Sequence, residues 1–176
     1  MEARVHRIAQ RLIPQDWTRG YPPMVVWYHR ELPMVMGDDG LPVEPRRVDP
    51  RLVDAAAKLG ALVDFIVVPC NAAHAGLREM REAARCPVLS MIDVVADDVT
   101  RRTCARVGLL GARGVPQPYL DALRERAVAD LRARSVDAVI LGCTEIPLLL
   151  GDETDAPDLI HPAALLADAA VRLAIA

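Results

Sequence analysis

Two cysteines stand at the ends of two similar apolar segments. Cys70 lies within residues 63–74, which read Val-Asp-Phe-Ile-Val-Val-Pro-Cys-Asn-Ala-Ala-His. Cys143 lies within residues 136–147, which read Val-Asp-Ala-Val-Ile-Leu-Gly-Cys-Thr-Glu-Ile-Pro. The pattern predicts two buried strands that each deliver one cysteine at the C-terminal end. The repeat therefore suggests a pair of facing thiols.

A thiol at the junction between the end of a strand and the start of a helix can act as an acid or a base. Backbone N–H groups and the positive end of the helix dipole favour an anion there and lower the pKa of the thiol. These N–H groups, with Asn71 and Thr144 directly after the cysteines, could hold a substrate carboxylate. If Cys70 and Cys143 face opposite sides of an α-carbon, one removes a proton and the other returns a proton from the far side. The product is the mirror-image stereocentre, and no cofactor is required.

Two other interpretations of the cysteines stay open. A cysteine at a strand end is usually a small buried apolar residue, and Cys86 and Cys104 are interpreted in this way, without a role. A metal site would combine Cys70, His74 and Cys143. Because a structural zinc site needs four ligands, usually with close Cys-x-x-Cys spacing, no metal is expected.

Three further polar residues lie close to the predicted site. His74 and Glu145 follow the two cysteines and could orient the thiols or tune their pKa. Each could equally cap its own helix. His161 comes just after the last predicted strand and is either a helix-start residue or a residue at the edge of the site.

The composition limits the classes of partner. The chain has 176 residues, a formal net charge of −3 and an aromatic content of 3%. Scattered arginines and few aromatic side chains argue against nucleic-acid binding. No apolar run approaches the roughly 18–20 residues that a membrane span needs, and the N-terminus does not resemble a secretory signal. We therefore expect a cytoplasmic protein with reduced cysteines that acts on a small molecule.

Short apolar runs alternate with helical patterns, which predicts an α/β fold with mostly parallel sheets flanked by helices. Both halves read as strand, cysteine, helix, strand, helix, so we expect two pseudo-symmetric lobes with the active site in the cleft between them. Residues 1–104 would form the first lobe and residues 105–176 a shortened second lobe, with a closing helix that could pack back on the first. Strands are predicted at residues 24–28, 64–69, 87–92, 107–110, 137–142 and 159–160. Helices are predicted at residues 2–13, 50–62, 71–85, 93–104, 119–134, 144–150 and 162–175.

In both cysteine segments the chain resembles the aspartate/glutamate racemase superfamily, and aspartate racemases most closely in motif. Those enzymes carry Pro-Cys-Asn-Thr-Ala-His and Gly-Cys-Thr-Glu, and this chain carries Pro-Cys-Asn-Ala-Ala-His at 69–74 and Gly-Cys-Thr-Glu at 142–145. The resemblance implies a cofactor-independent site with Cys70 and Cys143 as the acid/base pair. It also implies substrate contacts from Asn71, Ala72 and Thr144.

The chain departs from the family pattern in several places. It begins with a predicted helix at residues 2–13 where the family usually has a strand and a Gly-Gly-rich loop. The loop at 111–115 lacks the two threonines that hold the carboxylate in the family, and Pro33 is not followed by the arginine of Pro-x-Arg. An uncovered sheet edge favours pairing with another chain, so we expect a homodimer or a swapped assembly.

Three hypotheses about function follow. The first is a racemase or epimerase acting on a small amino acid or a related carboxylate. The second is a decarboxylase or cis–trans isomerase of the same superfamily, which the presence of both cysteines disfavours. The third is a non-catalytic binding derivative, which thiols of ordinary pKa and slow alkylation would favour.

Overall fold

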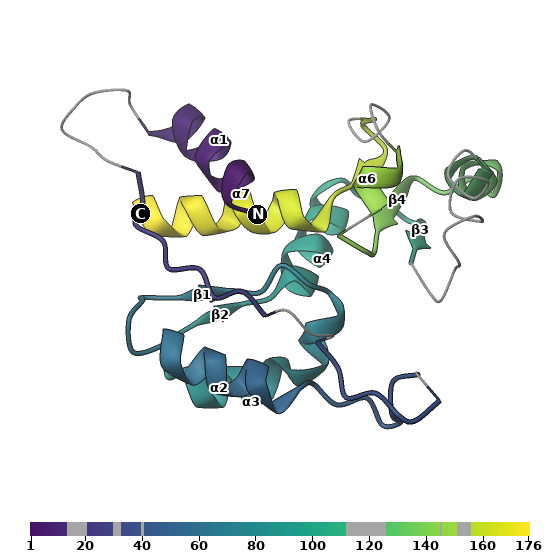
Figure 1. The fold of residues 1–176 in the computed structure, drawn as a ribbon. Coiled ribbons are helices and arrows are strands. Elements are labelled where there is room, and N and C mark those ends of the chain that lie inside the picture. Colours follow the sequence, from purple (N-terminus) through teal and green to yellow (C-terminus); the bar gives the residue numbers. More distant parts are fainter. Residues whose placement is uncertain (14–20, 30–32, 40, 112–125, 145, 151–155) are drawn as a thin grey trace. The chain divides into compact units, whose positions relative to one another are not determined.

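The computed structural model describes residues 1–13, 21–29, 33–39, 41–111, 126–144, 146–150 and 156–176 (Figure 1). The chain divides into two compact units. Unit 1 comprises Met1–Met91 and Leu166–Ala176, and unit 2 comprises Ile92–Leu165. The predicted lobes, residues 1–104 and 105–176, and the cleft between them stay predictions.

Unit 1 contains a pair of short parallel strands and a pair of helices. Strand β1 (Ile66–Val67) pairs with β2 (Val88–Leu89), and Ile66 lies opposite Val88. The helices are α2 (Pro50–Leu59) and α3 (Leu77–Ala84), and a short 3₁₀ helix, η1 (Ala72–Gly76), precedes α3. The buried core that joins these elements is formed by Ala56, Ile66, Met80, Ala84 and Val88.

Local sequence explains where α2 begins and how closely it approaches α3. The Asp49 side chain accepts a hydrogen bond from the Arg51 backbone N–H at 2.9 Å, and Pro50 occupies the first turn. A Cβ at Gly60 would lie 1.8 Å from the Ala84 carbonyl oxygen. The end of α2 therefore approaches the α3 backbone so closely that only glycine fits.

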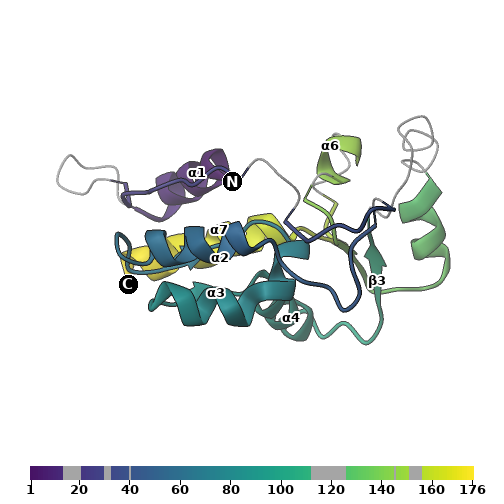
Figure 2. The ribbon, with the colours of Figure 1, turned by 60° about the horizontal axis from the view of Figure 1, so that its bottom comes forward.

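A second core in unit 1 joins the two ends of the chain. Helix α1 (Glu2–Leu12) packs against α7 (Pro162–Ile175), and the two helices lie close together in both Figure 1 and Figure 2. Apolar residues at helical spacing on α1 face α7, as the 3.6-residue period requires. The buried members of this core are Val5, Ile8, Ala9, Ile13, Ala167 and Val171.

The predicted strand at residues 24–28 is wrong. Residues 21–29 form no strand, and the five apolar side chains from Met24 to Tyr28 are 41–78% exposed. A strand needs a neighbouring backbone to complete its hydrogen-bond ladder, and Pro22 and Pro23 lack the N–H group. The β-branched and aromatic residues favour an extended backbone, but they do not provide the neighbouring strand that a hydrogen-bond ladder needs.

Unit 2 is built on a three-stranded parallel sheet. Strand β4 (Ala138–Leu141) lies in the centre, between β3 (Val107–Leu110) and β5 (Leu159–Ile160). Three of the four residues of the central strand are buried, as expected for a strand with neighbours on both sides, and both residues of β5 are buried as well. Helices α4 (Met91–Arg101) and α6 (Ile146–Leu150) flank it in sequence, and residues 126–133 are also helical.

Two side-chain cores hold the sheet of unit 2. One contains Val128, Val139, Leu141, Ile146, Leu150 and Leu159. The other contains Val95, Ala138 and Ile160, so β4 contributes to both. The Asp137 Oδ2 accepts the backbone N–H groups of Ala105 (2.7 Å) and Arg106 (2.8 Å), which ties the start of β4 to the start of β3.

The predicted fold class is confirmed at the level of an α/β fold with parallel sheets flanked by helices. The first two parallel strands are shorter than predicted, and the helix predicted at 71–85 begins as the 3₁₀ helix η1. The α-helix α3 that follows η1 ends at Ala84, before Arg85, which has a left-handed backbone conformation (φ 57°). Residues 119–125 of the predicted helix at 119–134 lie outside the described residues. None of the helices in the described segments has the length and apolar character that a membrane crossing requires.

Candidate active site

Cys70 lies in the connection between β1 and η1. Its side chain is half-buried, and its backbone N–H donates to the Val68 carbonyl at 2.8 Å. Asn71 follows, and its carbonyl accepts the His74 backbone N–H at 3.1 Å. Asn71 is half-buried and Ala72 is exposed, and these two of the three predicted substrate-contact residues directly follow the thiol in the same connection.

The helix dipole at Cys70 is weaker than the sequence suggests. The prediction places the N-terminus of a long helix at Asn71, but the α-helix α3 begins only at Leu77. The five residues between are the 3₁₀ helix η1, and the Asn71 side chain makes no cap hydrogen bond to it. A short 3₁₀ turn aligns fewer peptide dipoles than a long α-helix.

His74 connects the Cys70 loop to the start of α4. The imidazole is buried, with 7% of the residue exposed. Its Nδ1 lies 2.9 Å from the Cys70 carbonyl oxygen, and its Nε2 lies 2.8 Å from the backbone nitrogen of Met91. Sequence reasoning missed Met91 as a partner of His74, and no residue-type signal could have found it because the contact is made through the backbone.

Cys143 lies in the connection between β4 and α6. Its half-buried side chain packs against the core that contains Leu141 and Ile146. The Cys143 carbonyl accepts the Ile146 backbone N–H at 3.2 Å, which closes the first turn of α6. Thr144 is half-buried directly after the thiol, whereas the predicted supporting residue Glu145 lies outside the described residues.

The residue before Cys143 must be small. The Gly142 backbone N–H donates to the Leu110 carbonyl at 2.7 Å. A Cβ on Gly142 would lie 2.8 Å from Leu109 Cδ1 and 2.9 Å from that same carbonyl oxygen. Glycine is therefore required because β3 approaches the chain closely just before the thiol.

The structure thus groups the predicted residues by connection. Cys70, Asn71, Ala72 and His74 share one connection in unit 1, and Cys143 and Thr144 share another in unit 2. The predicted pairing of the two thiols stays a prediction. His161 follows β5 in unit 2 and is a half-buried residue.

The other cysteines and the acidic side chains in the described part of the chain do not form a metal site. No three His, Cys, Asp or Glu side chains of the described segments gather closely enough to hold a metal ion. Burial, and then the charge of Asp64, raise the pKa of the Cys86 thiol. Cys86 is therefore less able than an ordinary thiol to form the reactive thiolate.

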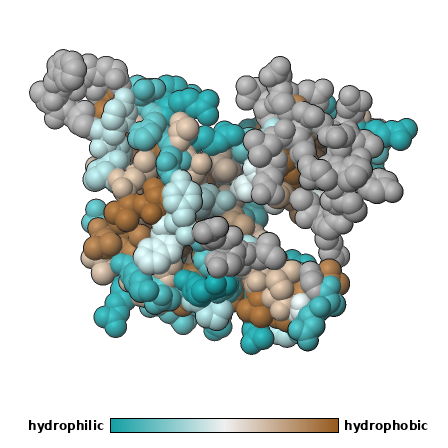
Figure 3. Space-filling view, viewed as in Figure 1, coloured by the Kyte–Doolittle hydropathy of each residue, from teal (hydrophilic) through white to brown (hydrophobic). Residues whose placement is uncertain are grey.

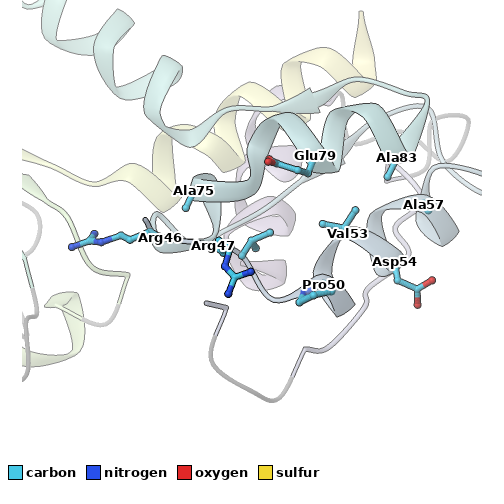
Figure 4. A pocket seen from close by; sticks show the side chains of 10 residues that line it. Arg46, Arg47, Pro50, Val53, Asp54, Ala57, Ala75, Glu79 and Ala83 are labelled. Carbon is cyan, nitrogen blue, oxygen red and sulfur yellow. The ribbon is translucent and has the colours of Figure 1, made fainter. Parts of the chain in front are cut away.

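A hollow of about 550 Å³ lies in unit 1 between α2 and α3 (Figure 4). Apolar side chains such as Val53 and Ala83 line it, with Arg47 and Glu79 among its charged residues. None of the predicted site residues lines this hollow. Ala75 of η1, the neighbour of His74 in sequence, is one of the lining residues.

Comparison with known proteins gives the family. The sequence pattern of the family described as Asp/Glu/Hydantoin racemase matches residues 3–126 of this chain, including Cys70. The chain belongs to this family.

Solved structures agree with this assignment at the level of the fold. An aspartate racemase homologue from Pyrococcus horikoshii OT3 is 18% identical with a TM-score of 0.72, over 99% of this chain and 92% of that one. An aspartate racemase from Picrophilus torridus is 22% identical with a TM-score of 0.54, over 69% of each chain.

Proposed function

We propose that the protein is a cofactor-independent racemase or epimerase of a small amino acid or a related carboxylate. The main support for this proposal is that the chain belongs to a racemase family and has a cysteine followed by a polar residue in two places. These are Cys70-Asn71 after β1 and Cys143-Thr144 after β4. Membership in a racemase family supports the reaction class. The presence of both thiols favours proton exchange over decarboxylation.

In the proposed reaction the two thiols exchange one proton each with the substrate. The Cys70 thiolate removes the α-proton and becomes a thiol, and the resulting carbanion is planar at the α-carbon. Cys143 then delivers its proton from the opposite face and becomes a thiolate, which leaves the protons and charges balanced. The reverse reaction uses the same groups with their roles exchanged.

The residues after each thiol would hold the substrate carboxylate. Asn71 and Thr144 offer side-chain hydrogen-bond donors, and the backbone N–H of Ala72 offers a further one. The carboxylate must be held because proton transfer requires the α-carbon to lie within reach of both sulfur atoms.

Proton exchange in deuterium oxide tests this proposal. Both enantiomers of acidic and apolar amino acids are incubated with the protein, and NMR follows deuterium uptake and inversion at the α-carbon. We expect uptake with inversion, reduced by about 10²–10⁴-fold in Cys70→Ser and in Cys143→Ser. Cys104→Ala is the matched control because Cys104 is another half-buried cysteine of unit 2, and it should keep full activity.

Other outcomes of the same experiment would contradict the proposal. No uptake from any amino acid, by folded protein with reduced thiols, would exclude amino-acid racemisation. Carboxylic acids without an amino group form the next panel, and carbon dioxide release from them would indicate a decarboxylase. Ordinary thiol pKa values and slow alkylation would favour a non-catalytic derivative.

We also propose a homodimer. Support comes from the apolar residues Met24 to Tyr28, which are exposed in unit 1. Figure 3 shows hydrophobic side chains at the surface on the face that carries this segment. Sedimentation velocity should show a dimer that Val26→Glu weakens, and a stable wild-type monomer would contradict the proposal.

A further inference from the structure

The two ring nitrogens of His74 are both engaged by backbone groups. Nδ1 lies 2.9 Å from the Cys70 carbonyl oxygen, and the Met91 backbone nitrogen lies 2.8 Å from Nε2. All three residues belong to unit 1. The contacts link the loop that carries the predicted catalytic thiol to the first residue of α4.

These partners fix the protonation state of the ring. A backbone N–H can only donate, so Nε2 must carry a lone pair to accept from Met91. A carbonyl oxygen can only accept, so Nδ1 must carry a proton to donate to Cys70. The ring that satisfies both partners is therefore neutral and protonated on Nδ1, since an imidazolium would set two N–H groups against each other at Met91.

The same contacts leave His74 without a free position for chemistry. Its one lone pair is used by Met91 and its one proton by the Cys70 carbonyl, and only 7% of the residue is exposed. A proton carrier or a metal ligand would need one of these positions. Breaking either hydrogen bond, of which the one from Met91 is buried and the one to Cys70 is partly buried, would take a partner from a backbone group.

We infer that His74 is a positioning residue, a neutral Nδ1–H brace that holds the Cys70 connection against the start of α4 and takes no part in proton transfer. The structural part of this inference stands on unit 1 alone. Its consequence for turnover rests on the proposed racemase function.

The tautomer is tested directly by NMR on the unmodified protein. Two-bond ¹H–¹⁵N correlations of labelled histidine distinguish Nδ1–H, Nε2–H and imidazolium rings, and His74 is assigned through bonds to its own backbone. We expect Nδ1–H at neutral pH. An Nε2–H ring or an imidazolium would overturn the inference, and no catalytic activity is needed for this result.

Two substitutions separate the two ends of the brace. His74→Asn places an amide N–H near the position of Nδ1 and keeps the donor to Cys70, whereas His74→Gln places an amide oxygen near Nε2 and keeps the acceptor for Met91. His74→Leu fills the site and keeps neither. The rate of iodoacetamide alkylation at Cys70, measured by mass spectrometry, reports how firmly the connection is held.

We expect Cys70 alkylation to rise by about twofold to tenfold in His74→Leu, the factor that corresponds to the loss of one or two buried hydrogen bonds. The Cys70 alkylation rates of His74→Asn and His74→Gln should lie between those of His74→Leu and the wild type. Cys143 is the internal control and should keep its rate in all three variants. An unchanged rate of Cys70 alkylation in folded His74→Leu would overturn the inference that His74 holds the Cys70 connection in place.

If the protein is a racemase, the pH profile of turnover separates positioning from catalysis. A positioning role lowers kcat in His74→Asn but leaves both limbs of the profile in place. Loss of one limb, with a fall of about 10²–10⁴-fold, would identify His74 as a proton carrier and overturn the inference. If no substrate is turned over, the proposed function fails while the NMR and alkylation results still decide the brace.

Discussion

The two cysteine connections have similar sequences but are held in different ways. After β4, Cys143 packs against an apolar core, and the chain before it lies against β3 at Gly142. After β1, Cys70 follows an exposed Pro69, and the connection is held by the hydrogen bonds of His74. Backbone packing positions one thiol, and a side-chain brace positions the other.

The sheets explain this difference. Strand β4 has a neighbour on each side, so the backbone of β3 is available to fix the residues just before Cys143. Strand β1 pairs with β2, and the segment from Met24 to Tyr28 forms no strand beside it. A connection that leaves a narrower sheet needs support from side chains, and the buried imidazole supplies it.

Substitution of the residue before each cysteine tests this comparison with the largest expected effect. Gly142→Ala should lower the free energy of unfolding by about 1–3 kcal/mol, because the new methyl group meets the Leu110 carbonyl and cannot be accommodated without moving β3. Pro69→Ala is the matched change at an exposed position and should stay within about 0.5 kcal/mol. Urea denaturation measures both, and equal effects would show that the two connections are held alike.

The aspartates of the two Val-Asp pairs give a smaller contrast. Asp137→Ala should cost about 1 kcal/mol, because Oδ2 accepts two backbone N–H groups that precede β3. Asp64 makes no such contact in the described part of the chain, so Asp64→Ala should be nearly neutral. Hydrogen exchange of the Ala105 and Arg106 amides provides a local readout, and full protection in Asp137→Ala would contradict this assignment.

The N-cap residue Asp49 should make the stability of helix α2 in unit 1 depend on pH in the acidic range. The Arg51 side chain, and then its backbone N–H, lower the pKa of Asp49 from its ordinary 3.8 to about 2. A carboxyl group whose pKa is lower in the folded state stabilises the fold above the unfolded pKa, and this contribution is lost as the pH falls through the folded value. Between pH 4 and pH 2, the amides of α2 should therefore lose protection, measured as the exchange rate relative to the intrinsic rate at the same pH.

Asp49→Asn separates charge from hydrogen bonding in this experiment. The amide oxygen can still accept the Arg51 backbone N–H, so α2 should form, but its stability should no longer change in that pH window. Asp158→Asn is the matched change in unit 2, where Arg132 lowers the pKa of the carboxyl. If α2 loses protection equally in wild type and Asp49→Asn, Asp49 is not the source of its acid sensitivity.

Much of the fold could be predicted from local sequence. The bounds of β3, β5 and α7 match the predicted residues, and the Asp49-Pro50 pair marks the start of α2. These elements are encoded by short-range features: apolar runs, helical periodicity, a capping side chain and a first-turn proline. The paired cysteine motifs likewise pointed to the racemase family.

Other features depended on residues distant in sequence. Residues 24–28 have the composition of a strand, yet strand formation depends on a neighbouring backbone that composition does not specify. His74 was predicted to be a supporting residue without a defined partner, because the N–H of Met91 belongs to the backbone and leaves no mark in residue type.

The sequence by itself therefore determined the family, the fold class and the two cysteine connections. Only the tertiary structure decided how each connection is held: Gly142 against β3, and His74 between Cys70 and Met91. The physical reason is range. Propensity, capping and periodicity act within a few residues, whereas close backbone approaches and buried hydrogen bonds join segments that only folding brings together.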